Sequence, residues 1–170
     1  MKKSYIFTLI LSIILVGVAF FFHEKLSEFR SLGLVGIFLI NLIGSATLFL
    51  PAPGIASVVA GGSIYPPLLV ALVASLGASV GDMVGYLLGT SSKHILLENK
   101  DGHLKTLMFY FKKYGAPVIV LLAFFPNPFF DAIGIVAGVL GYPVKKFFLW
   151  MFVGRLLRNI LLAYVGNRFF

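Results

Sequence analysis

Six polar side chains lie in stretches of the sequence that are otherwise almost wholly apolar. They are Asp82, Asn127, Asp131, Arg155, Arg158 and Asn159. An arginine offers a planar fork of donors that fits a carboxylate or a phosphate, and an aspartate accepts that fork or exchanges a proton. Together these side chains have the chemistry to bind an anionic group, with the aspartates holding the arginines or exchanging protons.

The sequence gives no sign of an enzyme. We identify no Walker loop, nucleophile elbow or HExxH motif, and no Ser, Cys or His nucleophile is positioned beside the six polar residues. The chain has no cysteine, and His23, His94 and His103 lie in polar loops without the spacing of metal ligands. We therefore predict no catalysis, no cofactor and no metal.

The composition indicates that lipid is the main solvent of this chain. Of its 170 residues, 59% are hydrophobic and only 12% are charged, and the mean hydropathy is +1.01. That leaves too little polar surface to coat a soluble domain. The net charge of +8 comes from basic residues scattered between the apolar segments. We therefore expect anionic lipid as the partner and exclude nucleic acid.

The N-terminus reads as a retained membrane helix. Met1-Lys2-Lys3 precedes an apolar run of about 19 residues, which is long for the core of a signal peptide, and no Ala-x-Ala cleavage site follows.

A unit of the sequence recurs after 77 residues. In this register Ala60-Gly61 aligns with Ala137-Gly138, Tyr65-Pro66 with Tyr142-Pro143, Gly77 with Gly154, and Gly89 with Gly166. With small changes of length, Pro51-Ala52-Pro53 also matches Pro126-Asn127-Pro128, and the residues before Gly33 match those before Gly115. The sequence therefore predicts two copies of one structural unit.

Each unit is expected to contain a turn within the membrane. The apolar stretch from Gly115 to Pro126 measures about 18 Å as a helix, whereas the hydrocarbon core is about 30 Å thick. Pro126 and Pro128 lack the N–H donor that a helix needs, so the chain should turn back there, and Pro51, Pro53 and Gly54 predict the matching turn. Such backbone is tolerated at membrane depth only inside protein or beside a wet cavity.

We therefore predict an all-α polytopic membrane protein with an inverted repeat. Its parts are an N-terminal transmembrane helix and short outer loop (1–28), a re-entrant hairpin with a spanning helix (29–89), a cytoplasmic amphipathic linker (90–110) and an inverted copy (111–170). The spanning helices are expected at about 68–89 and 147–166. The lysines gather on one side, so the positive-inside rule predicts a cytoplasmic N-terminus and an outer C-terminus, in a prokaryotic plasma membrane.

Small residues and one acid mark the first spanning helix. Gly77, Gly81, Gly85 and Gly89 recur at every fourth position and predict a face where another backbone packs closely. Asp82 lies among them. A carboxylate at membrane depth costs at least a few kcal/mol unless it is paired or hydrated, which makes it a functional candidate.

Helix geometry predicts that the polar residues meet. Asp82 should lie about 10 Å deep and Arg155 about 12 Å deep on an antiparallel helix, so the two can touch. We hypothesise a cluster of Asp82, Asp131, Arg155, Arg158 and Asn127, with Asn159 adjacent to Arg158, at the hairpin tips, where inverted-repeat transporters bind substrate. The alternative is a set of closed ion pairs that only hold the two repeats together.

Four segments resemble the DedA superfamily, which carries the VTT or SNARE-associated Golgi protein domain. They are LPAPGIASVVAGG, LGASVGDMVGYLLG, FPNPFFDAIGIVAG and the final GRLLRN. The similarity covers about residues 30–166, and the third segment is most like the vacuole membrane protein branch. The motif positions of this family fall on Pro51, Gly54, Gly61, Gly81, Asp82, Pro126, Asp131, Gly138 and Arg155.

The resemblance implies two facing re-entrant hairpins and the movement of lipids between leaflets. The expected substrate is a phospholipid or a polyprenyl phosphate, handled by a scramblase or flippase, with protons as a further candidate partner. Many bacterial members of the family carry a glutamate before the first proline block and an arginine before the second, and these residues are associated with proton-driven transport. This chain lacks that glutamate and has Ala123-Phe124-Phe125 where the arginine is usual, which favours passive exchange. The alternatives are a proton- or ion-coupled transporter of small solutes and a membrane scaffold without transport.

Overall fold

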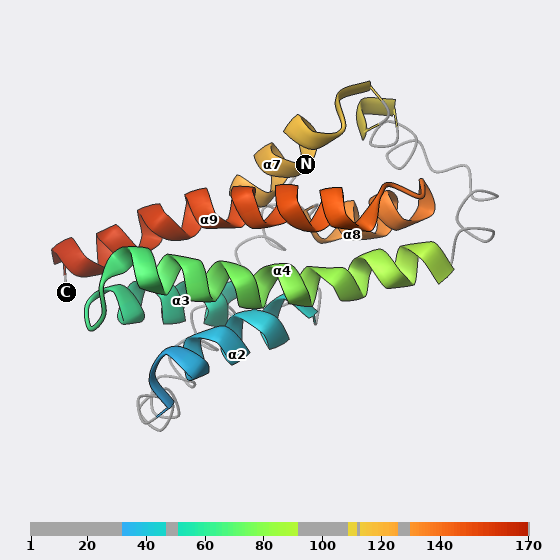
Figure 1. Ribbon diagram of the computed structural model, residues 1–170. Coiled ribbons are helices and arrows are strands. Elements are labelled where there is room, and N and C mark those ends of the chain that lie inside the picture. Colours follow the sequence, from blue (N-terminus) through green and yellow to red (C-terminus); the bar gives the residue numbers. More distant parts are fainter. Residues whose placement is uncertain (1–31, 47–50, 92–108, 112, 126–129, 170) are drawn as a thin grey trace, which may run out of the picture.

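The fold is helical throughout the part of the chain that the structure describes. This computed structural model describes residues 32–46, 51–91, 109–111, 113–125 and 130–169. Its helices, shown in Figure 1, are α2 (Gly33–Ala46), α3 (Pro51–Gly62), α4 (Pro67–Ser91), α7 (Ala116–Phe124), α8 (Phe130–Val139) and α9 (Val144–Phe169). The predicted N-terminal transmembrane helix and most of the predicted linker lie outside the described residues.

Helices α4 and α9 form the centre of the molecule. They contain 25 and 26 residues, so they extend about 37 and 39 Å. Both are long and apolar enough to cross a membrane, and they lie antiparallel, side by side (Figure 1). The prediction of two long apolar helices at these positions is confirmed, with each helix a few residues longer than expected.

The four short helices cover these two. Helix α2, at 14 residues, is the longest and measures about 21 Å, so none of the four crosses a hydrocarbon core of about 30 Å alone. Helix α2 packs on α4, and α7 packs on α9. Helix α3 packs on α9 and α8 packs on α4, so each of these two helices lies on the long helix of the other half.

One turn is built in the same way in both halves of the chain. Gly33 is the first residue of α2 and Gly115 precedes α7, and their φ angles of 53° and 49° are positive values that favour glycine. A Cβ on Gly33 would lie 3.0 Å from the hydroxyl oxygen of Tyr65, and one on Gly115 would lie 3.7 Å from the ring of Tyr142. In both halves a glycine with a positive φ angle therefore lies beside a tyrosine, and the two tyrosines are the residues of this contact that align after 77 positions.

The first proline block begins a helix. Helix α2 ends at Ala46 and a separate helix, α3, begins at Pro51, with Pro53 and Gly54 in its first turn, whereas residues 47–50 lie outside the described residues and the predicted turn stays a prediction. Proline suits this position because the first N–H groups of a helix have no intrahelical acceptor in any case, and its fixed φ angle is already helical. Pro126, Asn127 and Pro128, the second predicted turn, lie outside the described residues.

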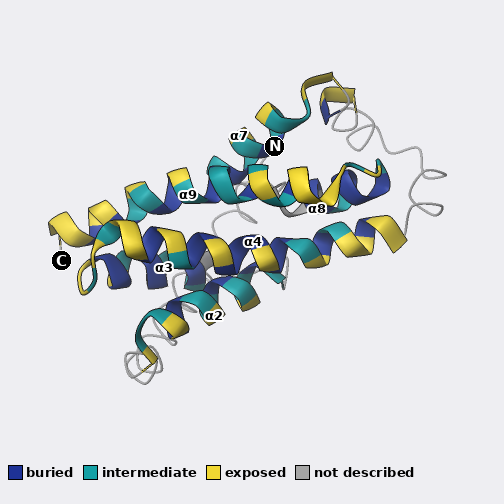
Figure 2. Cartoon of the chain, in the orientation of Figure 1, coloured by how far each residue is buried: buried dark blue, intermediate teal, exposed yellow. Residues whose placement is uncertain are grey.

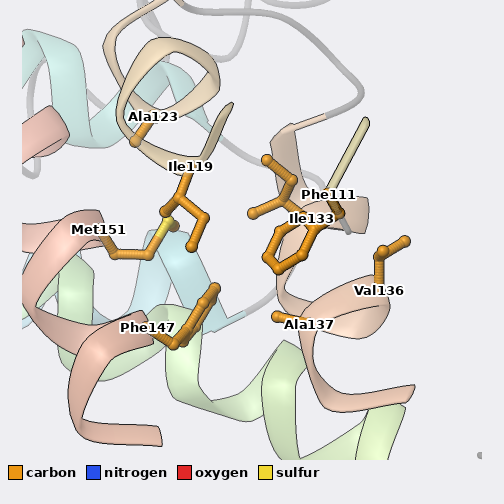
Figure 3. Packing of buried hydrophobic residues seen from close by; sticks show 8 residues of the cluster. All are labelled: Phe111, Ile119, Ala123, Ile133, Val136, Ala137, Phe147 and Met151. Carbon is orange, nitrogen blue, oxygen red and sulfur yellow. The ribbon is translucent and has the colours of Figure 1, made fainter. Parts of the chain in front are cut away.

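Two apolar clusters hold the helices together. The larger one, shown in Figure 3, joins α7, α8 and α9 and consists of Phe111, Ile119, Ala123, Ile133, Val136, Ala137, Phe147 and Met151. The smaller one joins α2, α3, α4 and α9 through Ile37, Val58, Val70, Ala74 and Ala163. Leucines and valines remain exposed along the outer faces of α4 and α9 (Figure 2), as expected for helices that face lipid.

Candidate functional site

An ion pair joins α4 to α9. Arg155 donates from Nη2 to Oδ1 of Asp82 at 2.6 Å and from Nε to Oδ2 at 3.1 Å. The two side chains are only 3% and 5% exposed. This two-pronged contact is the geometry in which arginine holds a carboxylate most firmly. Helix depth predicted the contact, and the structure contains it, whereas its part in transport stays a prediction.

Further polar side chains continue along the same interface. Ser75, Ser79 and Asp82 follow one face of α4 at spacings of four and three residues. Asn159 of α9 donates from Nδ2 to the hydroxyl of Ser75 at 3.0 Å. Because α4 and α9 are antiparallel, Ser79 lies between this contact and the ion pair. We call Ser75, Ser79, Asp82, Arg155 and Asn159 the polar seam.

The structure brings the predicted cluster together in part. Arg158 is buried on α9, less than one turn from Arg155. Asp131 is the second residue of α8, and Gly134 of that helix packs so closely on α4 that a Cβ there would lie 3.2 Å from the carbonyl oxygen of Asp82. Helix α8 is therefore next to the polar seam at Gly134, although the side chain of Asp131 and all of Asn127 lie outside the description.

The glycines of α4 pack against two helices. A Cβ on Gly77 or Gly81 would collide with backbone carbonyls of α2, and one on Gly89 would collide with the carbonyl of Ile135 in α8. Gly85 is buried where α4 meets α8, next to Gly134. The prediction of a close-packing face is confirmed, whereas the spacing of four did not indicate that two helices share this face.

The other predicted glycines also sit at close contacts. Gly138 of α8 faces the carbonyl of Tyr86 in α4, and Gly61 of α3 faces the side chains of Ile37 and Val70. A Cβ on Gly54 would lie 3.0 Å from Oδ1 of Asn41. Glycine suits these positions because atoms of neighbouring helices lie where a Cβ would be, or close to it.

Sequence reasoning missed a second polar contact, between α2 and α3. Asn41 is 3% exposed and donates from Nδ2 to the carbonyl of Ile37 at 2.8 Å and to the hydroxyl of Ser57 at 3.0 Å. Ser57 donates in turn to the carbonyl of Gly54 at 2.8 Å. An amide alone in an apolar run is a weaker signal of the same kind as Asp82, so the argument from membrane depth could have found it.

Ser75 and Ser79 were missed as well. The residues Gly77-Ala78-Ser79-Val80-Gly81 match the letters GxSxG, which the search for a nucleophile elbow should have noted. That motif requires its serine on a sharp turn between a strand and a helix. Ser79 lies in the middle of α4 instead, so its surroundings are those of a helix interface.

Comparison with known proteins places this architecture in a family. A family model described as the VTT domain matches residues 50–168. Searches of curated proteins and of solved structures found no match. The matched region includes α3, α4, α7, α8 and α9, and therefore the whole polar seam and both long apolar helices. The chain is a membrane protein that belongs to the VTT domain family.

Proposed function

We propose that the protein moves phosphate-bearing lipids between the two leaflets of a membrane, as a scramblase or flippase. The observation that carries the proposal is the buried pair of Asp82 and Arg155 near the middle of two helices long enough to cross a membrane. Ionised side chains at that depth are rare and commonly mark the path of a substrate. An arginine fork that grips a carboxylate can also grip a phosphate.

The architecture that we propose is an inverted repeat of two re-entrant hairpins, each followed by a spanning helix. Its support is the reciprocal packing of α3 on α9 and α8 on α4, together with the matching turns at Gly33 and Gly115. Four helices too short to cross the membrane alone fit the two hairpins. Inverted-repeat transporters bind their substrates at the interface between the repeats, which is where the polar seam lies.

The closed ion pair suggests how transfer would proceed. In the conformation described, Asp82 occupies the donors of Arg155, so a headgroup phosphate must compete for them. Separation of α4 from α9 would release the fork to the phosphate while the lipid tails stay in the bilayer. Because no step needs an energy source, the mechanism is passive exchange in both directions.

The test uses purified protein in liposomes that contain a fluorescent phospholipid and an external reductant that cannot cross the membrane. We expect bleaching well beyond half of the label with no ion gradient. The double variant Asp82→Asn/Arg155→Gln keeps polar side chains of similar size but removes both charges, and we expect its bleaching to stop near half. Size-exclusion chromatography of that variant shows whether it is still folded.

A scaffold without transport is the second candidate, because the ion pair is closed and buried. Buried pairs of this kind can be purely structural. If the folded double variant bleaches as fully as the wild type, the pair has no part in transfer. If the wild type itself stops near half, with that lipid and others, the scaffold becomes the better description.

A further inference from the structure

Two atoms of the polar seam are buried without a hydrogen-bond partner among the described residues. They are the hydroxyl oxygen of Ser79 and Oδ1 of Asn159, and both residues are 0% exposed. The other end of the Asn159 amide is engaged, because its Nδ2 donates to Ser75. Buried polar atoms are nearly always satisfied in native proteins, so each such exception requires an explanation.

These atoms lie close to the arginine that we propose binds the headgroup. Ser79 is at the centre of α4, halfway between Pro67 and Ser91. Asn159 follows Arg155 by one turn of α9, a separation of about 5–6 Å between Cβ atoms. An acceptor and a hydroxyl therefore lie beside the arginine fork at mid-depth.

The basic residue of the polar seam selects the kind of ligand. Arg155 is buried on α9, and its guanidinium fork fits the phosphate of an anionic headgroup. Oδ1 of Asn159 needs a donor, which a phosphate diester at neutral pH does not have, so the donor must come from the rest of the headgroup.

We propose that the polar seam selects anionic phospholipids whose headgroup also carries hydroxyl groups, such as phosphatidylglycerol. The phosphate would bind Arg155, and a hydroxyl one helical turn away would donate to Oδ1 of Asn159 and share a hydrogen bond with Ser79. This inference rests on the proposed lipid transfer and adds the headgroup to it. A headgroup that ends in an alkyl chain has no donor for Oδ1 of Asn159 and would leave that atom unsatisfied, which slows its passage.

The test compares phosphatidylglycerol with phosphatidylethanol, both labelled on an acyl chain. The two lipids carry the same charge and differ in the hydroxyl groups of the headgroup. In proteoliposomes of the wild type, we expect phosphatidylglycerol to cross about fivefold faster, the effect of one hydrogen bond. Asn159→Leu should bring the ratio of the two rates close to one, and Ser79→Ala should lower it. The matched control is Ser63→Ala, which removes an exposed hydroxyl outside the seam and should leave the ratio unchanged.

The outcomes separate the two proposals. If neither lipid crosses, lipid transfer itself fails. If both cross at the same rate in the wild type, lipid transfer stands and headgroup selection is wrong, as it would be if water alone satisfied Ser79 and Asn159. A preference for phosphatidylglycerol that persists unchanged in both Asn159→Leu and Ser79→Ala would also overturn the assignment to the polar seam. Because Ser79→Ala removes only a hydroxyl, it remains informative if Asn159→Leu does not fold.

Discussion

Breaking a buried ion pair is costly mainly because it leaves one buried charge without its counterion. Removing Asp82 would take from the buried guanidinium of Arg155 the carboxylate that it binds through two hydrogen bonds, and removing Arg155 would take both of those donors from the buried carboxylate. Two neutral side chains of similar size leave no charge uncompensated. At the scale of the residue, a variant that removes both charges can therefore separate the part of the charges in transfer from their part in stability.

We accordingly expect Asp82→Ala and Arg155→Ala each to lower the free energy of unfolding by about 3–5 kcal/mol. The double variant Asp82→Asn/Arg155→Gln should lose less than either single variant. Denaturant titration in detergent micelles, followed by circular dichroism, measures all three. A double variant that loses at least as much stability as either single variant would contradict this expectation.

The hydrogen bond between Asn41 and Ser57 is an uncharged counterpart of the ion pair, and its loss should cost less. Asn41→Leu and Ser57→Ala each remove one side of a buried hydrogen bond between α2 and α3. A double-mutant cycle should give a coupling energy of about 0.6 kcal/mol, the average for hydrogen bonds inside membrane proteins. The cycle is measured by the same unfolding titration, and a coupling near zero would contradict the contact.

Close packing of backbones dominates at the scale of the element. Where α8 crosses α4, Gly138 faces the carbonyl of Tyr86 and Gly89 faces the carbonyl of Ile135. Where α3 crosses α9, Gly62 faces the carbonyl of Ala163 and Gly166 faces that of Val59. At each crossing, both helices thus contribute a glycine. Small residues let the backbones of membrane helices pack closely, which favours association where the hydrophobic effect does not drive it.

Gly138→Ala and Gly141→Ala make the same chemical change three residues apart, with different expected effects. At Gly138 the new methyl group would collide with backbone, and the free energy of unfolding should fall by about 3 kcal/mol or more. At Gly141 the methyl group meets nothing within 4 Å, and only the φ angle of 64° opposes it, at about 1 kcal/mol. Equal losses in thermal unfolding would show that the crossing is looser than described.

The elements also show how far the sequence could predict the fold. The long helices followed from their length and apolarity, and the glycine face followed from its spacing of four. The proline blocks predicted an interruption but not its place, because proline is as compatible with the first turn of a helix as with a break before it. That ambiguity put Pro51 in the predicted turn when it begins α3.

At the scale of the whole molecule, the sequence showed its internal similarity but not that α3 and α8 each pack on the long helix of the other half. The register of 77 residues aligned Gly77 with Gly154 and Tyr65 with Tyr142. This register does not predict that α3 packs on α9, because the sequence of an apolar helix does not show which neighbouring helix it packs against. The ion pair could be found because charge is rare at that depth, whereas Asn41, Ser75 and Ser79 have weaker signals.

The antiparallel pair makes a direct prediction about topology. The end of α4 and the start of α9 should lie on one side of the membrane, and the start of α4 and the end of α9 on the other. The chain has no cysteine, so single cysteines can be introduced without a background. Ser91→Cys and Lys145→Cys should react with an impermeant maleimide from one side, and Ser63→Cys and Asn167→Cys from the other. Labelling of Ser91→Cys and Lys145→Cys from opposite sides would mean that the two helices do not cross as a pair.

The separation of Asp82 and Arg155 along the chain has a consequence for biosynthesis. The two residues are 73 positions apart, so at about 5–20 residues per second Asp82 leaves the ribosome about 4 to 15 s before its partner. During that interval α4 carries a carboxylate with no guanidinium to meet it. The carboxylate of Asp82 must therefore be hydrated, protonated or in contact with the insertion machinery until α9 has been inserted.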